Sequence, residues 1–113
     1  MKIAVLNKTD VKSGAAIAAY RIHQACRSIG INSKMYTDIS ERDDWTIKSP
    51  NSKFDRIIGY AKQNISRSFT DLMITSNPIV HSPSLFPSKW KKRLNSSKND
   101  IVHLHWVCAE MLS

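Results

Sequence analysis

The chain of 113 residues has few of the features that mark several classes of protein. Its two cysteines, Cys26 and Cys108, lie far apart in the sequence, so we expect reduced thiols and no disulfide framework. No apolar run is long enough to cross a bilayer, and the first apolar run is too short for the core of a signal peptide. We therefore expect a cytoplasmic protein.

Acidic residues are in the minority, with nine Asp and Glu against 17 Lys and Arg, and the net charge is +8. Such a charge favours anionic partners: phosphates, nucleotides, an acidic membrane surface or nucleic acid. The sequence lacks an aromatic RNP pattern, a GXXG loop and zinc-finger spacing. Nucleic acid is therefore not the partner we expect.

The apolar pattern of the first 39 residues predicts a strand, a helix and a second strand. KIAVL (residues 2–6) is a short apolar run typical of a strand buried on both faces. A helix then ends at Gly30, and a second strand covers residues 31–39. The predicted apolar stripe of the helix is Ala15, Ala18, Ala19, Ile22, Ala25, Cys26 and Ile29. Strands joined in this way are expected to be parallel, with a right-handed crossover.

The second half of the chain predicts a loop, two helices and a last strand. Residues 40–52 are polar and charged, and the spacing of Ser52 and Asp55 is that of a capping box at the start of a helix. That helix has a long apolar stripe and ends at Asn77-Pro78. WKKRL (residues 90–94) is a short helix candidate, and Ile101–Val107 is the last strand. The fold class is α/β, half of a doubly wound parallel sheet, in which ligands bind beyond the carboxyl ends of the strands.

KSGAA (residues 12–16) joins the first strand to the first helix and is the first candidate site. A helix N-terminus offers unpaired backbone N–H groups, and Gly14 would let a phosphate approach the backbone closely. The plainer alternative is that Ser13 only caps the helix and Gly14 only permits the turn. Local sequence favours that alternative, because there is no GxGxxG pattern and no GK[ST] ending.

HLHW (residues 103–106) is the second candidate site. His103 and His105 share one face of the last strand, and Trp106 points to the other. The pair suits a metal, but neither Asp100 nor Glu110 has a recognisable spacing for a third ligand. The alternatives are two neutral histidines hydrogen-bonded in the core, or a His105 that lines a ligand crevice.

The third candidate site is basic. It contains Lys89, Lys91, Lys92, Arg93 and Lys98, with Trp90 among them. Trp beside Lys and Arg suits an acidic membrane interface or a nucleic-acid backbone. The usual explanation of such a run is a solvated surface.

Three segments together resemble a known family. They are SGAAIAAYRIHQACRSIGINSKMYT (13–37), SPSLFP (82–87) and DIVHLHWV (100–107) followed by AEMLS, whereas residues 40–75 contribute little. They resemble the N-terminal part of family-four glycosyltransferases with the GT-B fold, of the bacterial exopolysaccharide or colanic-acid type.

The resemblance implies two Rossmann-like domains, with the acceptor held by the first and the nucleotide-sugar by the second. It implies a retaining enzyme that needs no metal ion and no cofactor. It places Ser13, Gly14 and Ala15 near the donor phosphates, although Ser13 stands where the family usually has glycine, and it places His105 and Trp106 near the cleft. The acceptor would be a polysaccharide or a lipid-linked saccharide.

On this resemblance, residues 1–113 would be an incomplete N-terminal, acceptor-side domain, a partial Rossmann-like sheet without the donor-binding domain. The catalytic histidine of the family lies on the next strand, and neither His103 nor His105 matches it. We therefore expect no catalytic residue within the chain and no activity from it alone. Apart from the resemblance, the basic run itself makes Lys89–Arg93 a candidate for contact with the inner face of the membrane. The alternative function is a small basic α/β module that binds anionic lipid or nucleic acid through Lys89–Lys98.

Overall fold

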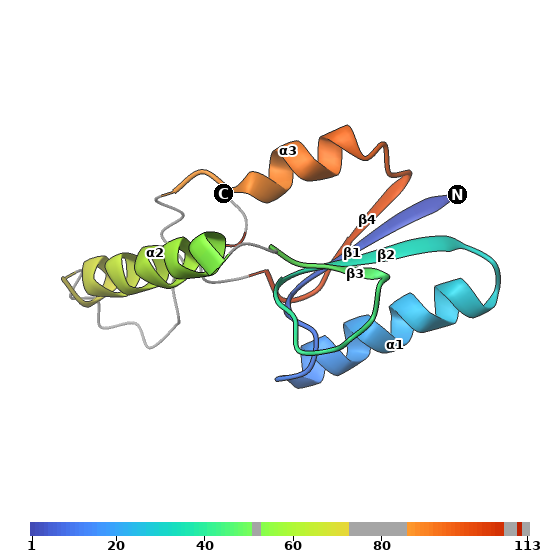
Figure 1. Cartoon of the computed structure of the whole chain (residues 1–113), viewed down its shortest axis with the longest axis horizontal. Coiled ribbons are helices and arrows are strands. Elements are labelled where there is room, and N and C mark those ends of the chain that lie inside the picture. Colours follow the sequence, from blue (N-terminus) through green and yellow to red (C-terminus); the bar gives the residue numbers. More distant parts are fainter. Residues whose placement is uncertain (51–52, 73–85, 108–110, 112–113) are drawn as a thin grey trace.

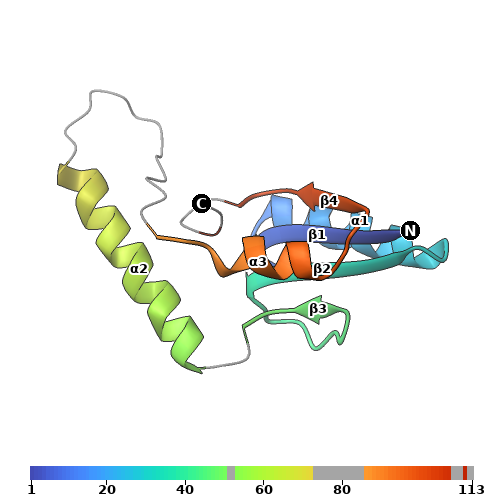
Figure 2. The same cartoon turned by 90° about the horizontal axis from the view of Figure 1, so that it is seen from above.

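The chain forms a four-stranded parallel sheet with helices on both faces. The computed structural model describes residues 1–50, 53–72, 86–107 and 111. The strands lie in the order β3-β2-β1-β4, and every pair of neighbours is parallel (Figure 2). Their bounds are β1 Lys2–Thr9, β2 Asn32–Ile39, β3 Ile47–Lys48 and β4 Ile101–Leu104. The α/β class with a partial Rossmann-like parallel sheet, expected from the sequence, is thereby confirmed.

The three helices among the described residues have different relations to the sheet. Helix α1 (Gly14–Ser28) covers one face, and α3 (Lys89–Ser96) covers the other (Figure 1). Helix α2 (Lys53–Leu72) lies to one side and contacts β2. Among the described residues, no helix has the length and apolar character needed to span a membrane.

Strand β1 is the centre of the fold, because it pairs with β2 on one side and with β4 on the other. Its residues Ala4, Val5 and Leu6 are completely buried, as the KIAVL run predicted. Alternate residues of the sheet face two separate cores. The core under α1 is Ile3, Val5, Ala19, Met35 and Ile47, and the core under α3 is Ala4, Leu6, Tyr36, Trp90 and Met111.

Both ends of α1 have the local chemistry that the sequence indicated. The Ser13 side chain accepts a hydrogen bond of 3.1 Å from the Ala16 N–H, which is the N-cap interaction. At the other end Gly30 has φ +83°, a left-handed conformation that favours glycine. The Ile31 N–H then donates to the Cys26 carbonyl at 3.0 Å, as in a Schellman motif.

The buried face of α1 overlaps only in part with the one that the apolar pattern predicted: Ala19 is buried and Cys26 packs against the core. Of the predicted stripe, Ala18, Ile22, Ala25 and Ile29 are exposed. The helix buries Ala19 of that stripe, together with Ala16 and His23, against the sheet. The small alanine side chains let the helix approach β1 and β2. Hydrogen bonds hold the His23 imidazole in this interface, so it takes the buried position that the pattern gave to larger aliphatic side chains.

Two strand predictions need correction. Strand β3 lies within residues 40–52, which were expected to be a loop. Strand β4 ends at Leu104 and not at Val107, although two further hydrogen bonds to β1 continue past its end. They run from the His105 N–H to the Leu6 carbonyl and from the Lys8 N–H to the Trp106 carbonyl, both at 2.9 Å. The predictions for Ser52, Asn77-Pro78 and Cys108 fall outside the described residues.

His23 connects α1 to β2 and to the residue before β3. Its Nδ1 lies 2.8 Å from Ser33 Oγ, and its Nε2 lies 2.8 Å from Thr46 Oγ1. Thr46 Oγ1 donates its own proton to Asp44 at 2.6 Å, so it accepts from Nε2–H, and Nδ1 accepts from Ser33. Burial lowers the pKa of His23 below its usual 6.5, although the nearby Asp44 carboxylate opposes this shift.

This lowered pKa predicts a pH-dependent stability. The unfolded chain takes up a proton at His23 more readily than the folded chain does. The stabilising contribution of neutral His23 to the free energy of unfolding is therefore present above about pH 6.5 and is lost as the pH falls below it. Denaturant unfolding of wild type and His23→Gln between pH 7.5 and about 5.5 measures this. We expect the free energy of unfolding to depend less on pH in His23→Gln. His103→Gln, which alters an exposed histidine, is the control and should behave as wild type. An unchanged pH dependence in His23→Gln would contradict this assignment.

Candidate functional site

The carboxyl ends of the parallel strands meet at one edge of the sheet, the edge at which α/β proteins bind ligands. A cavity of about 510 Å³ lies there, between the ends of β1 and β2, helix α2 and helix α3. Its apolar wall includes Ile39, Pro50, Ile58, Tyr60, Pro87, Trp90 and Met111. Its charged wall includes Lys8, Asp38, Asp55, Lys62, Lys89, Lys92 and Arg93.

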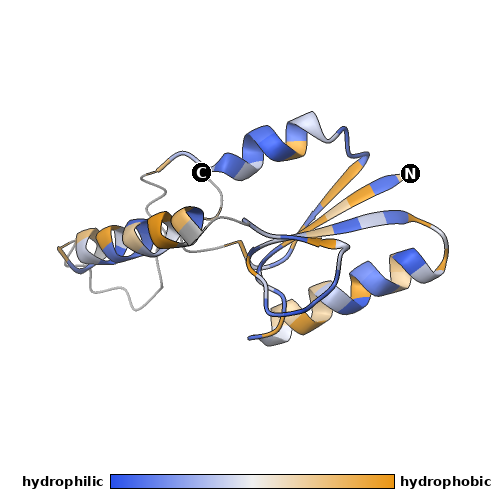
Figure 3. Ribbon diagram, viewed as in Figure 1, coloured by the Kyte–Doolittle hydropathy of each residue, from blue (hydrophilic) through white to orange (hydrophobic). Residues whose placement is uncertain are grey.

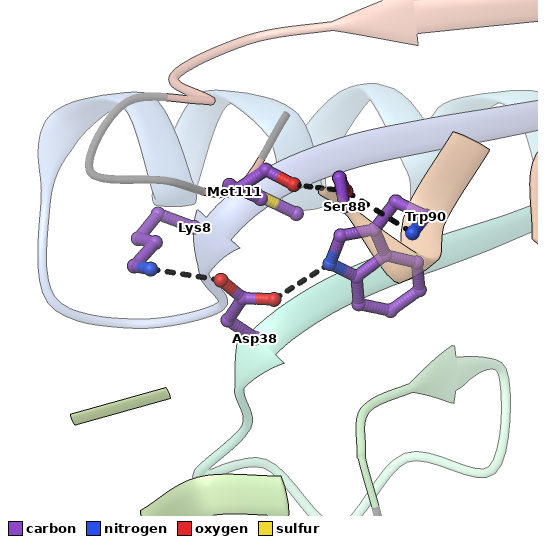
Figure 4. A network of polar contacts seen from close by, with 5 residues as sticks. All are labelled: Lys8, Asp38, Ser88, Trp90 and Met111. Carbon is purple, nitrogen blue, oxygen red and sulfur yellow. Dashed lines mark hydrogen bonds and ion pairs between the residues drawn. The ribbon is translucent and has the colours of Figure 1, made fainter. Parts of the chain in front are cut away.

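Asp38, near the end of β2, organises one wall of this cavity (Figure 4). One of its carboxylate oxygens accepts from Lys8 Nζ of β1 at 2.8 Å, and the other accepts from Trp90 Nε1 of α3 at 2.6 Å. The Lys8 and Asp38 side chains are 14% and 25% exposed, so water screens their ion pair only in part. A single carboxylate therefore connects two strands and a helix.

The start of α3 is fixed by Ser88. The Ser88 side chain accepts from the Trp90 N–H at 3.1 Å and donates to the Met111 carbonyl at 2.5 Å (Figure 4). The first contact is an N-cap, and the second holds Met111 against the sheet. Trp90 and Met111 are 4% and 1% exposed, so both belong to the core under α3.

The charges of the cavity are unequally paired. Asp38 pairs with Lys8, and Asp55 of α2 pairs with Lys89 of α3. Among the described residues no carboxylate pairs with the remaining three cations, Lys62, Lys92 and Arg93. Two of these cations lie over aromatic rings: Lys62 over Phe86 at 5.5 Å and Arg93 over Trp90 at 5.4 Å. The cavity therefore suits a ligand with an anionic group and an apolar part.

Two buried polar residues shape the strand ends, and the sequence patterns did not single out either of them. The Asn7 side chain accepts from the Trp106 N–H at 2.9 Å and so holds the chain after β4 against β1. The Asp10 carboxylate accepts from Ser40 Oγ at 2.7 Å and from the N–H groups of Glu41 and Arg42, each at 2.9 Å. The available signal was their position: Asn7 directly follows the apolar run of residues 3–6, and Asp10 directly follows the last residue of β1.

The loop residues Ser13, Gly14 and Ala15, predicted to approach a phosphate, do not line the cavity. The Ser13 side chain is engaged as the N-cap of α1, as the plainer alternative proposed. A Cβ added at Gly14 would meet nothing within 4 Å, and the φ of Gly14 is not positive, so neither packing nor backbone conformation demands glycine there. Phosphate approach at this loop stays a prediction.

The histidines of HLHW lie side by side, with ring centroids 4.3 Å apart. The interpretation of both as hydrogen-bonded core residues is wrong, because His103 is exposed and the buried Nε2 of His105 has no hydrogen-bond partner among the described residues. Burial, with a smaller effect of His103, lowers the pKa of His105. Trp106 is 51% exposed. Within the part of the chain that the structure describes, no three His, Cys, Asp or Glu residues group as metal ligands would.

The basic segment forms α3, as the short-helix prediction stated. Lys89, Lys91, Lys92 and Arg93 are exposed, as a membrane-contacting or solvated face requires. Trp90, which was predicted to contact a membrane with them, is instead buried, because its ring packs against Tyr36 and its indole N–H is bound by Asp38.

Comparison with known proteins gives no relative: no family model matches the chain, and neither does any curated protein or solved structure. Functional inference therefore rests on the fold, on the geometry of this edge of the sheet and on the resemblance of the sequence segments.

The Asp38 contacts predict a graded effect of substitution on stability. Asp38→Ala leaves the buried indole N–H of Trp90 without an acceptor, so it should lower the free energy of unfolding by about 1–3 kcal/mol. Asp38→Asn keeps a side-chain acceptor for Trp90 and loses the charge pair with Lys8, so it should cost less. Denaturant unfolding measures both variants. Equal losses in the two variants would contradict the role given to the indole hydrogen bond.

Proposed function

We propose that this chain is the acceptor-side part of a retaining glycosyltransferase. In this proposal a second Rossmann-like unit binds the nucleotide-sugar, and the sugar passes to a polysaccharide or a lipid-linked saccharide. The resemblance of residues 13–37 and 100–107 to family-four enzymes supports this assignment. A parallel sheet in the order β3-β2-β1-β4 is compatible with the N-terminal domain of such an enzyme.

One observation carries the proposal: the cavity at the carboxyl edge of the sheet has an apolar wall and a surplus of cations. Lys62, Lys92 and Arg93 would hold a phosphate or another anionic group of the acceptor. Ile58 and Tyr60 of α2 would lie along an attached apolar tail. A lipid-linked saccharide combines these two chemical parts, so it fits this cavity better than an uncharged sugar would.

The surface around β4 supports a larger domain. Ile101 lies on the α1 face of this edge strand, Val102 and Leu104 lie on the α3 face, and all three are 42–48% exposed. Strands of a parallel sheet normally have both faces covered by helices. A further strand beside β4, with its own helix, would bury these residues together with Ile22 of α1, which is 36% exposed.

In this proposal the residues of the chain bind and orient the acceptor, and the chemical step belongs to the complete enzyme. No catalytic residue is assigned here. His105 and Trp106 follow the end of β4, so they remain candidates for the wall of a cleft between two units. Robust sugar transfer by the isolated 113 residues would contradict the proposal that this chain only binds and orients the acceptor.

Binding of octyl phosphate tests the acceptor site. We expect it to bind more tightly than octyl glucoside, which lacks the charge, and more tightly than inorganic phosphate, which lacks the tail. Lys92→Ala with Arg93→Ala should weaken octyl phosphate binding about tenfold, which corresponds to ~1.4 kcal/mol. Lys34→Ala with Lys48→Ala removes two exposed cations outside the cavity and is the matched control. Calorimetric titration or NMR shifts measure these affinities.

Two results would contradict the proposal. Equal affinity for octyl phosphate and octyl glucoside would show that the cations do not select the ligand. Displacement of octyl phosphate by a single-stranded oligonucleotide, with strong salt dependence, would favour the nucleic-acid-binding module instead.

A further inference from the structure

Helix α2 exposes an apolar stripe along its whole length. Figure 3 shows apolar and polar residues alternating around this helix. The large apolar side chains recur at helical spacing, and each is at least 45% exposed: Phe54, Ile57, Ile58, Ile65, Phe69 and Leu72. The pattern is that of an amphipathic helix, but the apolar face is open where a core helix would bury it.

The face that α2 turns toward the protein is a different one. Asp55, Gly59 and Lys62 line the cavity, and Ser66, one turn further along the same side, is only 6% exposed. Asp55 also pairs with Lys89 of α3. These four α2 residues lie roughly a quarter turn from the centre of the apolar stripe. The stripe is therefore not the surface by which α2 joins the described part of the fold.

Positive charge is concentrated in α2 and α3, and cations of α3 adjoin this stripe. Helix α2 contains four basic and two acidic residues, and α3 contains four basic residues and no acidic one, so the two helices hold six of the eight net charges. Ile58, at the edge of the stripe, lines the cavity together with Lys92 and Arg93 of α3. Apolar side chains and cations thus adjoin one another on the same side of the molecule.

We propose that α2 and α3 form a surface that docks on an anionic lipid bilayer. The apolar stripe of α2 enters the boundary between headgroups and acyl chains, and the exposed cations of α3 bind the headgroups. A second copy of the chain is a poorer occupant, because it would bring a further +8 against this surface. The inference does not depend on the proposed glycosyltransferase function.

Sedimentation with lipid vesicles tests the proposal. Wild type should bind mixed vesicles that contain phosphatidylcholine and phosphatidylglycerol in equal proportion. It should bind vesicles of phosphatidylcholine alone far more weakly. Ile57→Ser with Phe69→Ser should lower the partition coefficient about tenfold, because two exposed apolar anchors are removed. Ile17→Ser with Ile29→Ser removes two exposed apolar residues, one in α1 and one at its C-cap, and should have no effect.

The headgroup contacts have their own variant pair. Lys91→Glu should lower binding to the mixed vesicles by about tenfold. Lys34→Glu, on β2, makes the same change of net charge and should lower it much less. Lys91 does not line the cavity, so octyl phosphate binding should stay unchanged in this variant, which separates the membrane surface from the acceptor site.

Three results would overturn the proposal. One is equal binding of wild type to both kinds of vesicle, or to neither. Another is an equal loss in test and control pairs. The third is a dimer of the wild type in sedimentation velocity that becomes a monomer in Ile57→Ser with Phe69→Ser, while vesicle binding stays the same. That result would assign the stripe to contact with a second copy of the chain.

Discussion

Strand β1 must be buried on both faces and hydrogen-bonded along both edges, and the rest of the fold follows from this constraint. Its apolar residues Ala4, Val5 and Leu6 are completely buried, with α1 covering one face and α3 the other. The strand then continues into polar residues that remain inside the protein. Asn7 binds the chain after β4, Lys8 binds Asp38 of β2, and Asp10, in the loop that follows, binds the turn that follows β2. The ends of three strands are thereby fixed at one edge of the sheet.

The binding chemistry at this edge depends on which cations lack a carboxylate neighbour. Asp38 and Asp55 engage Lys8 and Lys89, and both pairs serve to hold structural elements together. Lys62, Lys92 and Arg93 surround the same cavity, and no carboxylate among the described residues pairs with them, so they would be the groups that meet an anionic ligand. An anion would be bound at the boundary between α2 and α3, on the side of the sheet away from α1. The loop at Ser13 and Gly14 lies on the opposite face of the sheet, beside α1. If this loop and the cavity both bind phosphates, they would therefore bind two separate phosphate groups.

Local patterns predicted most of the elements but not how distant residues pair. KIAVL, the Ser13 cap and Gly30 correctly placed β1 and α1, because each acts through neighbouring residues. The contact of Trp90 with Asp38 spans 52 positions, and no local pattern contains it. Strand β3 was missed because two residues have no periodicity. The orientation of α1 was wrong because hydrogen bonds to Ser33 and Thr46 make His23 a buried residue.

The candidate site was predictable only in its location. The rule that parallel α/β sheets bind ligands at their carboxyl edge pointed to the edge at which the cavity lies, but the cavity is built by residues from four separate elements. The most direct test of this site is an NMR measurement of intermolecular NOEs between octyl phosphate and the protein. The account predicts NOEs from the octyl chain to the Ile58 methyl groups and the Tyr60 ring. NOEs to the residues around Ser13–Ala15 instead, or none to α2, would contradict it.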